Sequence, residues 1–138
     1  MKGILNSGIL VVSLVIILGS CKAQKRTSDQ LIAQEYAITQ LGDKEVSESE
    51  LTLKVNPENS VISGYAGCNN YSYSYKLKEG KLNLGYATAT KIYCEDSMEL
   101  ENLFFQKMSS VTQFESSKQA IYFKNEDGKI LVKAKKKD

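Results

Sequence analysis

The sequence predicts an α+β domain: a curled antiparallel sheet of about seven or eight strands, a partly closed barrel, with one helix packed on its open side. Three observations support this. Tyr71 to Leu77 alternates between apolar and polar residues, as a half-buried strand does. Only one later stretch has apolar residues at helical spacing. The connections are short, which favours antiparallel neighbours, and one helix cannot cover a flat sheet of this size.

Three strands are predicted before the central hairpin. Gln34 to Leu41 alternates with Tyr36 and Ile38 facing inward, and Leu51, Leu53 and Val55 alternate with polar residues. The Asn56-Pro57-Glu58-Asn59 turn then leads into a short strand from Val61 to Tyr65. Gly64 and Gly67 flank the end of this strand, which predicts a positive φ or a close backbone approach there.

The central hairpin has the clearest pattern in the chain. Its first strand places Tyr71, Tyr73, Tyr75 and Leu77 on one face; Glu79-Gly80 forms the turn, and Leu82 and Leu84 continue the apolar face on the returning strand. The tyrosine row has two interpretations: it packs on the core or on the flank of the helix, or it forms a ligand-binding face. We favour packing, with the hydroxyl groups reaching the rim.

The helix is predicted from an apolar stripe of Leu100, Leu103, Phe104 and Met108. Asp96 and Glu99 fit a capping box, and Ser97 is an alternative cap. Strands are expected at Val111 to Glu115, Ala120 to Lys124 and Lys129 to Ala134. The basic tail from Lys133 to Lys137 is expected to be a solvated end, with a weak attraction to anionic lipid head groups as the alternative.

The start of the chain is typical of an exported lipoprotein. Residues 1–20 read as a signal peptide, because the apolar run from Ile9 to Leu18 is too short to span a bilayer; a buried core helix is the alternative. The Leu18-Gly19-Ser20-Cys21 sequence resembles a bacterial lipobox, which implies cleavage before Cys21 and lipidation of that residue. Residues 21–30 then form the lipidated N-terminus and a polar tether, and residues 31–138 form the domain.

The cysteine count fits an oxidising compartment. Of three cysteines, Cys21 carries the lipid, which leaves Cys68 and Cys94 as an even pair that we predict to form a disulfide. The alternative is two reduced, buried cysteines. Two cysteines in a chain without histidine do not supply the four ligands of a structural zinc, so we predict no metal and no cofactor.

Four features of the chain occur in a characteristic order: Gly67-Cys68-Asn69-Asn70-Tyr71, then Leu82-Asn83-Leu84-Gly85, then Thr90-Lys91-Ile92-Tyr93-Cys94, and a helix followed by a closing Gly-Lys-Ile-Leu-Val strand. Together they resemble the META domain, also called the HslJ-like domain. The family usually has a tryptophan before its first strand; this chain has none, and Tyr36 stands there. The resemblance implies a small envelope domain, often lipidated, associated with heat-shock induction, novobiocin tolerance and, in parasites, virulence. It brings no catalytic residues.

Three functional classes follow from these observations. The first is a non-enzymatic envelope domain that binds a protein or peptide partner or helps to maintain the envelope under stress. The second is a small-molecule or lipid carrier that uses the barrel interior. The third is an enzyme, which we do not expect, because the chain lacks histidine and the common nucleophile and phosphate-binding motifs.

The remaining expectations concern charge and location. Glu95, Asp96 and Glu99 form an acidic cluster that suits a helix start better than a catalytic carboxylate site. The near-neutral charge excludes a large nucleic-acid surface, and we expect a monomer. We expect the protein to have two partners: the membrane, through lipidated Cys21, and an unknown envelope protein or peptide. Because Lys22 is not aspartate, analogy with lipoprotein sorting in a two-membrane bacterium predicts the outer membrane, facing the periplasm.

Overall fold

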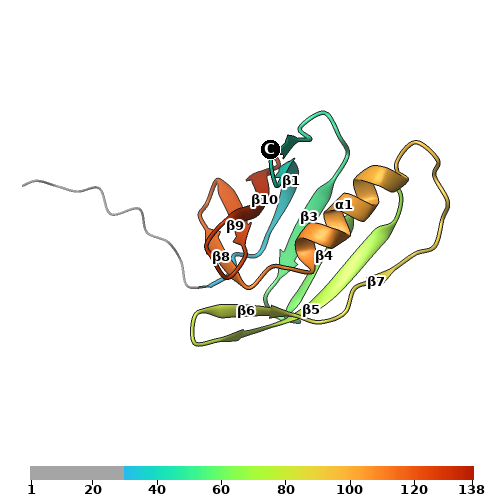
Figure 1. Ribbon diagram of the computed structural model, residues 1–138. Helices are drawn as coiled ribbons and strands as arrows, with labels where there is room; N and C mark the ends of the chain where they lie inside the picture. Colours follow the sequence, from blue (N-terminus) through green and yellow to red (C-terminus); the bar gives the residue numbers. More distant parts are fainter. Residues whose placement is uncertain (1–29) are drawn as a thin grey trace, which may run out of the picture.

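The computed structural model describes residues 30–138, which form one domain built from a single sheet and one helix (Figure 1). The predicted signal peptide, the lipidation at Cys21 and most of the tether lie outside the described residues. In chain order the elements are β1 (Gln34–Leu41), β2 (Lys44–Glu45), β3 (Thr52–Asn56), β4 (Val61–Tyr65), β5 (Asn70–Lys78), β6 (Lys81–Leu84), β7 (Thr88–Ala89), α1 (Met98–Met108), β8 (Gln113–Ser116), β9 (Ala120–Lys124) and β10 (Ile130–Lys136).

The sheet is antiparallel and curls into a nearly closed barrel. Its strand order is β6-β5-β4-β3-β1-β10-β9-β8, with β2 paired to β1 and β7 paired to β5. The two outermost strands of this order approach each other, because the Leu82 N–H on β6 donates to the carbonyl of Thr112 just before β8 at 2.9 Å. The predicted fold, a curled sheet with one helix on its open side, is therefore confirmed.

Side chains fill the interior of the barrel. Tyr36 and Ile38 from β1, Phe123 from β9, and Phe104 and Met108 from α1 are all fully buried. The helix lies across the open side of the sheet and places Phe104 and Met108 against the core (Figure 1). Among residues 30–138, no helix is long and apolar enough to cross a membrane.

Three local predictions are wrong. The strand expected at Val111 to Glu115 begins two residues later, as β8. The Asp96–Glu99 capping box does not form: Ser97 occupies the N-cap position, and its side chain makes no capping hydrogen bond. Leu77, expected on the apolar face, is 39% exposed. Its cross-strand partner Leu82 is only 2% exposed, so the edge of the core lies at this pair.

The basic tail is also more structured than a solvated end. β10 continues to Lys136 and lies between β1 and β9, so that it is a central strand of the sheet. Backbone bonds hold its last residues on both sides: the Lys136 N–H donates to Gln119 at 2.9 Å, and the Lys137 N–H donates to Glu35 at 3.1 Å. The lysines of this tail are therefore held in fixed positions.

Candidate functional site

The six motif residues Gly67, Cys68, Asn69, Tyr71, Thr90 and Cys94 come together where the turn between β4 and β5 meets the segment after β7 and the helix α1. A disulfide joins Cys68 to Cys94, whose Cα atoms are 5.8 Å apart. Gly67 has a φ of 99°, a conformation that strongly favours glycine, and it lets the chain turn between Ala66 and Cys68. The motif thus forms one cluster rather than several separate sites.

Asn69 is the centre of this cluster and is only 3% exposed. Its carboxamide oxygen accepts from the Thr90 hydroxyl and from the Ile92 N–H, both at 2.7 Å, and its amide group donates to the Ile92 carbonyl at 3.0 Å. One side chain therefore fixes residues 90–92 through three bonds. Between the two residues of β7 and the turn before α1, this segment has no regular secondary structure.

Glu101 links the same cluster to the helix. Its carboxylate accepts from the Asn69 backbone N–H at 2.8 Å and from the Asn69 side-chain amide at 3.0 and 3.2 Å, and the residue is 6% exposed. Sequence reasoning missed this residue, because a glutamate in the first turns of a helix is usually taken for a dipole or solvation residue. The signal that was available is its spacing: Glu101 lies three residues before Phe104 and seven before Met108, which places it on the same face of the helix as these two apolar residues.

The tyrosine row packs as predicted. Tyr71, Tyr73 and Tyr75 are each less than 8% exposed, and the Tyr71 ring lies 4.6 Å from that of Phe104 on the helix. Burial raises the pKa of Tyr71 well above its usual range and that of Tyr73 to about 12. Both therefore remain neutral at physiological pH, as expected of phenol groups packed in the core.

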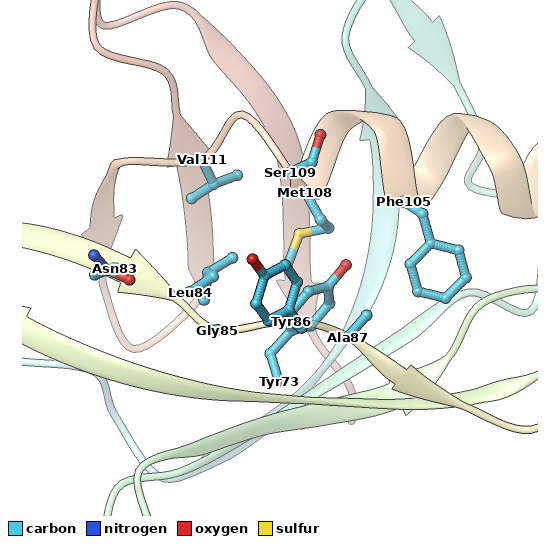
Figure 2. Close-up of a pocket in the computed structure, with 10 residues that line it drawn as sticks. All are labelled: Tyr73, Asn83, Leu84, Gly85, Tyr86, Ala87, Phe105, Met108, Ser109 and Val111. Atoms are coloured by element: carbon cyan, nitrogen blue, oxygen red, sulfur yellow. The ribbon is translucent and has the colours of Figure 1, made fainter.

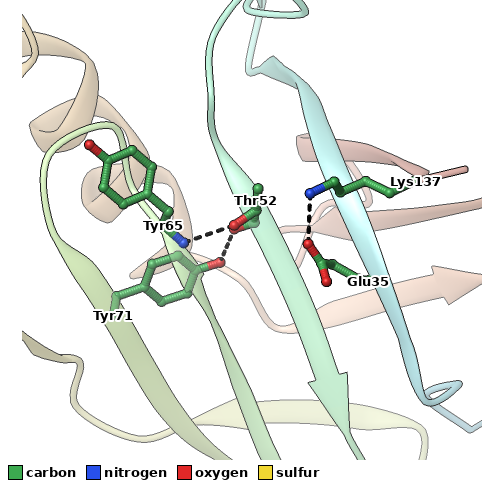
Figure 3. Close-up of polar contacts among 5 residues, drawn as sticks. All are labelled: Glu35, Thr52, Tyr65, Tyr71 and Lys137. Atoms are coloured by element: carbon green, nitrogen blue, oxygen red, sulfur yellow. Dashed lines mark hydrogen bonds and ion pairs between the residues drawn. The ribbon is translucent and has the colours of Figure 1, made fainter.

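The Tyr71 hydroxyl has one specific partner (Figure 3). The Tyr71 side chain reaches across β4, and its hydroxyl donates to the Thr52 carbonyl on β3 at 2.9 Å. The Tyr65 N–H donates to the Thr52 side chain at 3.0 Å. Gly64 makes this crossing possible, because a Cβ there would lie 2.1 Å from the Thr52 carbonyl oxygen and 3.0 Å from the Tyr71 hydroxyl. The predicted close approach at Gly64 is confirmed, and it serves the packing of the tyrosine.

The predicted acidic cluster does not form a site. Glu95, Asp96 and Glu99 are all exposed, and Glu99 makes a 3.9 Å ion pair with Lys44. Among the described residues, no group of three or more acidic, cysteine or histidine side chains is placed to hold a metal.

An open, mostly apolar cleft of about 680 Å³ lies between the C-terminal half of α1 and the end of β6 with the residues that follow it (Figure 2). Met108 reaches from the helix into this cleft, facing Tyr73 of β5, while Tyr86 and Ala87 line the strand side. No charged side chain lines it; the complete lining is Tyr73, Asn83, Leu84, Gly85, Tyr86, Ala87, Phe105, Met108, Ser109 and Val111.

A bulge shapes the strand side of the cleft. β6 pairs Leu84 with Tyr75, whereas β7 pairs Thr88 with Ser72, so the register along β5 shifts by one residue between the two pairings. The Gly85 N–H still donates to the Ser74 carbonyl at 2.8 Å, so Tyr86 and Ala87 together lie opposite the single residue Tyr73. Tyr86 is 99% exposed and stands at the mouth of the cleft.

Comparison with known proteins gives one family and one fold. A family model described as META domain matches residues 29–138. No curated protein sequence matches the chain at a significant level. An NMR structure of a protein from Burkholderia xenovorans is similar, with a TM-score of 0.61 and 20% identity, covering 78% of this chain and 85% of that chain. A second NMR structure has a TM-score of 0.59 and 20% identity, covering 78% of this chain and 92% of that chain. At these identities the likeness shows the fold alone.

Proposed function

Because this chain belongs to the META domain family, we propose that it is an envelope lipoprotein anchored through Cys21, whose domain has no chemistry of its own and binds an extended segment of a partner protein. The proposed location is the outer membrane, facing the periplasm, as Lys22 predicts. The observation that carries the proposal is the cleft between α1 and the segment from Gly85 to Ala87, because this segment leads into β7, which among residues 30–138 pairs with β5 alone.

The free edge belongs to the segment from Gly85 to Ala89. Within residues 30–138, β7 pairs with β5 alone, and the residues that lead into it, from Gly85 to Ala87, line the cleft. The Thr90 N–H donates to Asn70 on β5. In an antiparallel ladder the direction of the backbone groups alternates, so Thr88 also points to β5, and Ala87 and Ala89 present their N–H and C=O groups outward.

A strand edge beside an apolar groove suits an extended peptide. Such a peptide adds to the sheet through main-chain hydrogen bonds, and alternate side chains enter the groove. The floor offered here is apolar, with Tyr73, Phe105, Met108 and Val111, and no charged group lines it. The partner segment is therefore expected to be extended, uncharged and apolar at alternate positions.

The carrier alternative has less support. A carrier of the predicted kind holds its ligand inside the barrel, whereas here large side chains such as Tyr36, Phe104 and Phe123 are fully buried in that space. One large apolar side chain is instead exposed at the cleft, because Tyr86 is 99% exposed. An exposed aromatic residue beside an apolar cleft favours a protein partner.

The absence of chemistry is part of the proposal. The chain has no histidine. Glu95, Asp96 and Glu99 are exposed and do not line the cleft. A hydrolase screen on the purified domain should give no turnover above background. Turnover that is lost when Glu95, Asp96 or Glu99 is replaced would contradict the proposal.

Site-specific photo-crosslinking in cells of the native host tests partner binding. A photoreactive residue in place of Tyr86 should give a discrete cross-linked product, and mass spectrometry should map it to an extended segment of the partner. As a control, the photoreactive residue should not give this product when it replaces Tyr65, on the outer face of β4. Ala87→Pro removes the outward N–H and should abolish the product, whereas Ala87→Val keeps the N–H and should retain it.

Two outcomes would refute the proposal. The first is the same product from Tyr65 as from Tyr86. The second is a product at Tyr86 that is unaffected by Ala87→Pro while the variant remains folded, as judged by its melting temperature.

A further inference from the structure

The chain enters the barrel at one end, which we call the tether end. There the side-chain amide of Gln34, at the start of β1, donates to the carbonyl of Lys118 in the β8–β9 turn at 3.4 Å, and the end of β10 is bonded to Glu35 through the Lys137 N–H at 3.1 Å. Residues 30 and 31 share a groove with the β3–β4 turn and with the β5–β6 hairpin, which projects at the lower left of Figure 1.

The tether end is basic. Its turns and strand ends carry seven lysines and four acidic residues, a net charge of +3. The lysines are Lys76, Lys78, Lys81, Lys118, Lys135, Lys136 and Lys137, and the acidic residues are Glu35, Glu58, Glu79 and Asp138. All seven lysines are exposed, and two of the acids, Glu58 and Glu79, lie in the tight turns between them.

The opposite end, which we call the distal end, is strongly acidic. It consists of the β1–β3 connection, with the Lys107 side chain that lies against Gly42, the segment from Lys91 to the start of α1, and the β9–β10 turn. The Lys44–Glu99 pair at 3.9 Å and the Lys129–Asp43 pair at 3.6 Å link these parts. Nine acidic residues and four lysines give it a net charge of −5. The acids are Asp43, Glu45, Glu48, Glu50, Glu95, Asp96, Glu99, Glu126 and Asp127, and the lysines are Lys44, Lys91, Lys107 and Lys129.

The segment that precedes the described domain joins it at the tether end. Eight residues separate Cys21 from Gln30, and three of them, Lys22, Lys25 and Arg26, are basic against a single Asp29. A chain of this length spans at most about 30 Å when fully extended. A lipid at Cys21 would therefore hold the tether end close to the bilayer and the acidic distal end away from it.

We propose that the tether end docks on anionic lipid head groups of the membrane that holds Cys21, so that the domain stands upright with its distal end pointing away. Each basic residue near an anionic surface adds to the attraction, and acidic residues at the far end lie beyond the roughly 8 Å over which the surface potential decays at physiological salt. The charge separation along the barrel thus selects one orientation. The inference takes the lipid anchor from the proposed function.

Lysine footprinting on vesicles tests the docking directly. Residues 21–138 contain the whole described core, and Cys21 is their only free thiol because Cys68 and Cys94 are joined, so a maleimide lipid can supply the anchor. The anchored protein is acetylated with a water-soluble reagent on phosphatidylcholine vesicles and on vesicles that also contain phosphatidylglycerol. On the anionic vesicles, acetylation at the tether-end lysines should slow at least about threefold, whereas at Lys44, Lys91 and Lys129 it should not change. High salt should remove the difference.

A pair of charge-matched variants makes the test specific. The triple variant Lys78→Gln, Lys81→Gln and Lys118→Gln should lose the protection of the remaining tether-end lysines. The control Lys44→Gln, Lys91→Gln and Lys129→Gln has the same net charge and should keep it.

Equal acetylation on both vesicle types, or protection of the distal lysines, would overturn the docking. Because the anchor is added chemically, failure here is distinct from an absence of lipid on Cys21 in the native protein, which mass measurement of the membrane form reports separately.

Discussion

Truncating the buried side chain of Asn69 should be one of the most destabilising single changes outside the apolar core of this domain. Asn69→Ala removes three bonds to residues 90–92 and two to the Glu101 carboxylate, and it leaves only the Asn69 backbone N–H as a donor to Glu101. Ile92 is 59% exposed, so its backbone groups can bond to water instead, but Glu101 is 6% exposed and cannot.

The cost is therefore determined mainly by Glu101. Hydrogen bonds to a charged group contribute about 1.5–3 kcal/mol, and a buried acceptor that loses its donors retains its desolvation penalty. With a smaller contribution from the partly hydrated bonds to Thr90 and Ile92, we expect a loss of about 3 kcal/mol in the free energy of unfolding. This corresponds to a decrease in melting temperature of about 12 °C or more.

Urea unfolding of the oxidised protein, followed by circular dichroism, measures this change. Asn70→Ala is the matched control, because Asn70 is the next residue and is exposed, and it should change the stability by less than about 0.5 kcal/mol. Amide hydrogen exchange at Ile92 should accelerate in Asn69→Ala only. A loss below about 1 kcal/mol, with an unchanged dependence on urea, would refute the view that this network holds the segment.

Three further predictions concern other parts of the chain. Replacing Cys68 and Cys94 together with serine should remove about 3 kcal/mol and lower the melting temperature by about 10 °C or more; intact-mass measurement after alkylation without reductant should find no free thiol on either residue of the native protein. Cys21→Ser should move the protein from the membrane to the soluble fraction, and continued membrane recovery with an uncleaved leader would contradict lipidation. Burial raises the pKa of Tyr73 to about 12, so its contribution to stability is complete below about pH 10 and is lost as the pH rises toward 12. Tyr73→Phe should make the alkaline loss of stability less steep in urea unfolding, and an unchanged slope would show that Tyr73 does not contribute to it.

The alternation of apolar residues predicted most of the fold. The strands β1, β3, β4, β5 and β9 lie where the pattern placed them, because each has one face in the core and one in solvent, and a period of two follows directly. The curl of the sheet followed from a count of elements, since one helix leaves most of a flat sheet uncovered. The predicted pairing of Cys68 with Cys94 agrees with the disulfide in the structure.

The parts that were missed depend on contacts distant in sequence. The segment 90–94 has strand-like residues, but its backbone bonds to the side chain of Asn69, which no local pattern reports. Glu101 can be buried because Asn69 donates hydrogen bonds to its carboxylate. Its burial could therefore be recognised only once the helix was packed against the turn between β4 and β5. The cleft is equally invisible, since it arises from a one-residue register shift at Tyr86 between two short pairings.

The motif and the cleft therefore have different roles that depend on each other. The turn at Gly67, Cys68 and Asn69 holds residues 90–94 through the disulfide and the hydrogen bonds of Asn69. All polar groups of the Asn69 side chain are used in these bonds and in those to Glu101, so that none remains for a ligand. A segment held at both ends, by β6 on one side and by the disulfide on the other, keeps its edge and the Tyr86 bulge in place before any partner arrives. The partner binding that we propose would therefore require little further ordering of this segment, whereas such ordering is a main cost of docking on a flexible loop. Asn69→Ala should accordingly weaken cross-linking from Tyr86 in cells even at temperatures at which the variant remains folded, whereas Asn70→Ala should not.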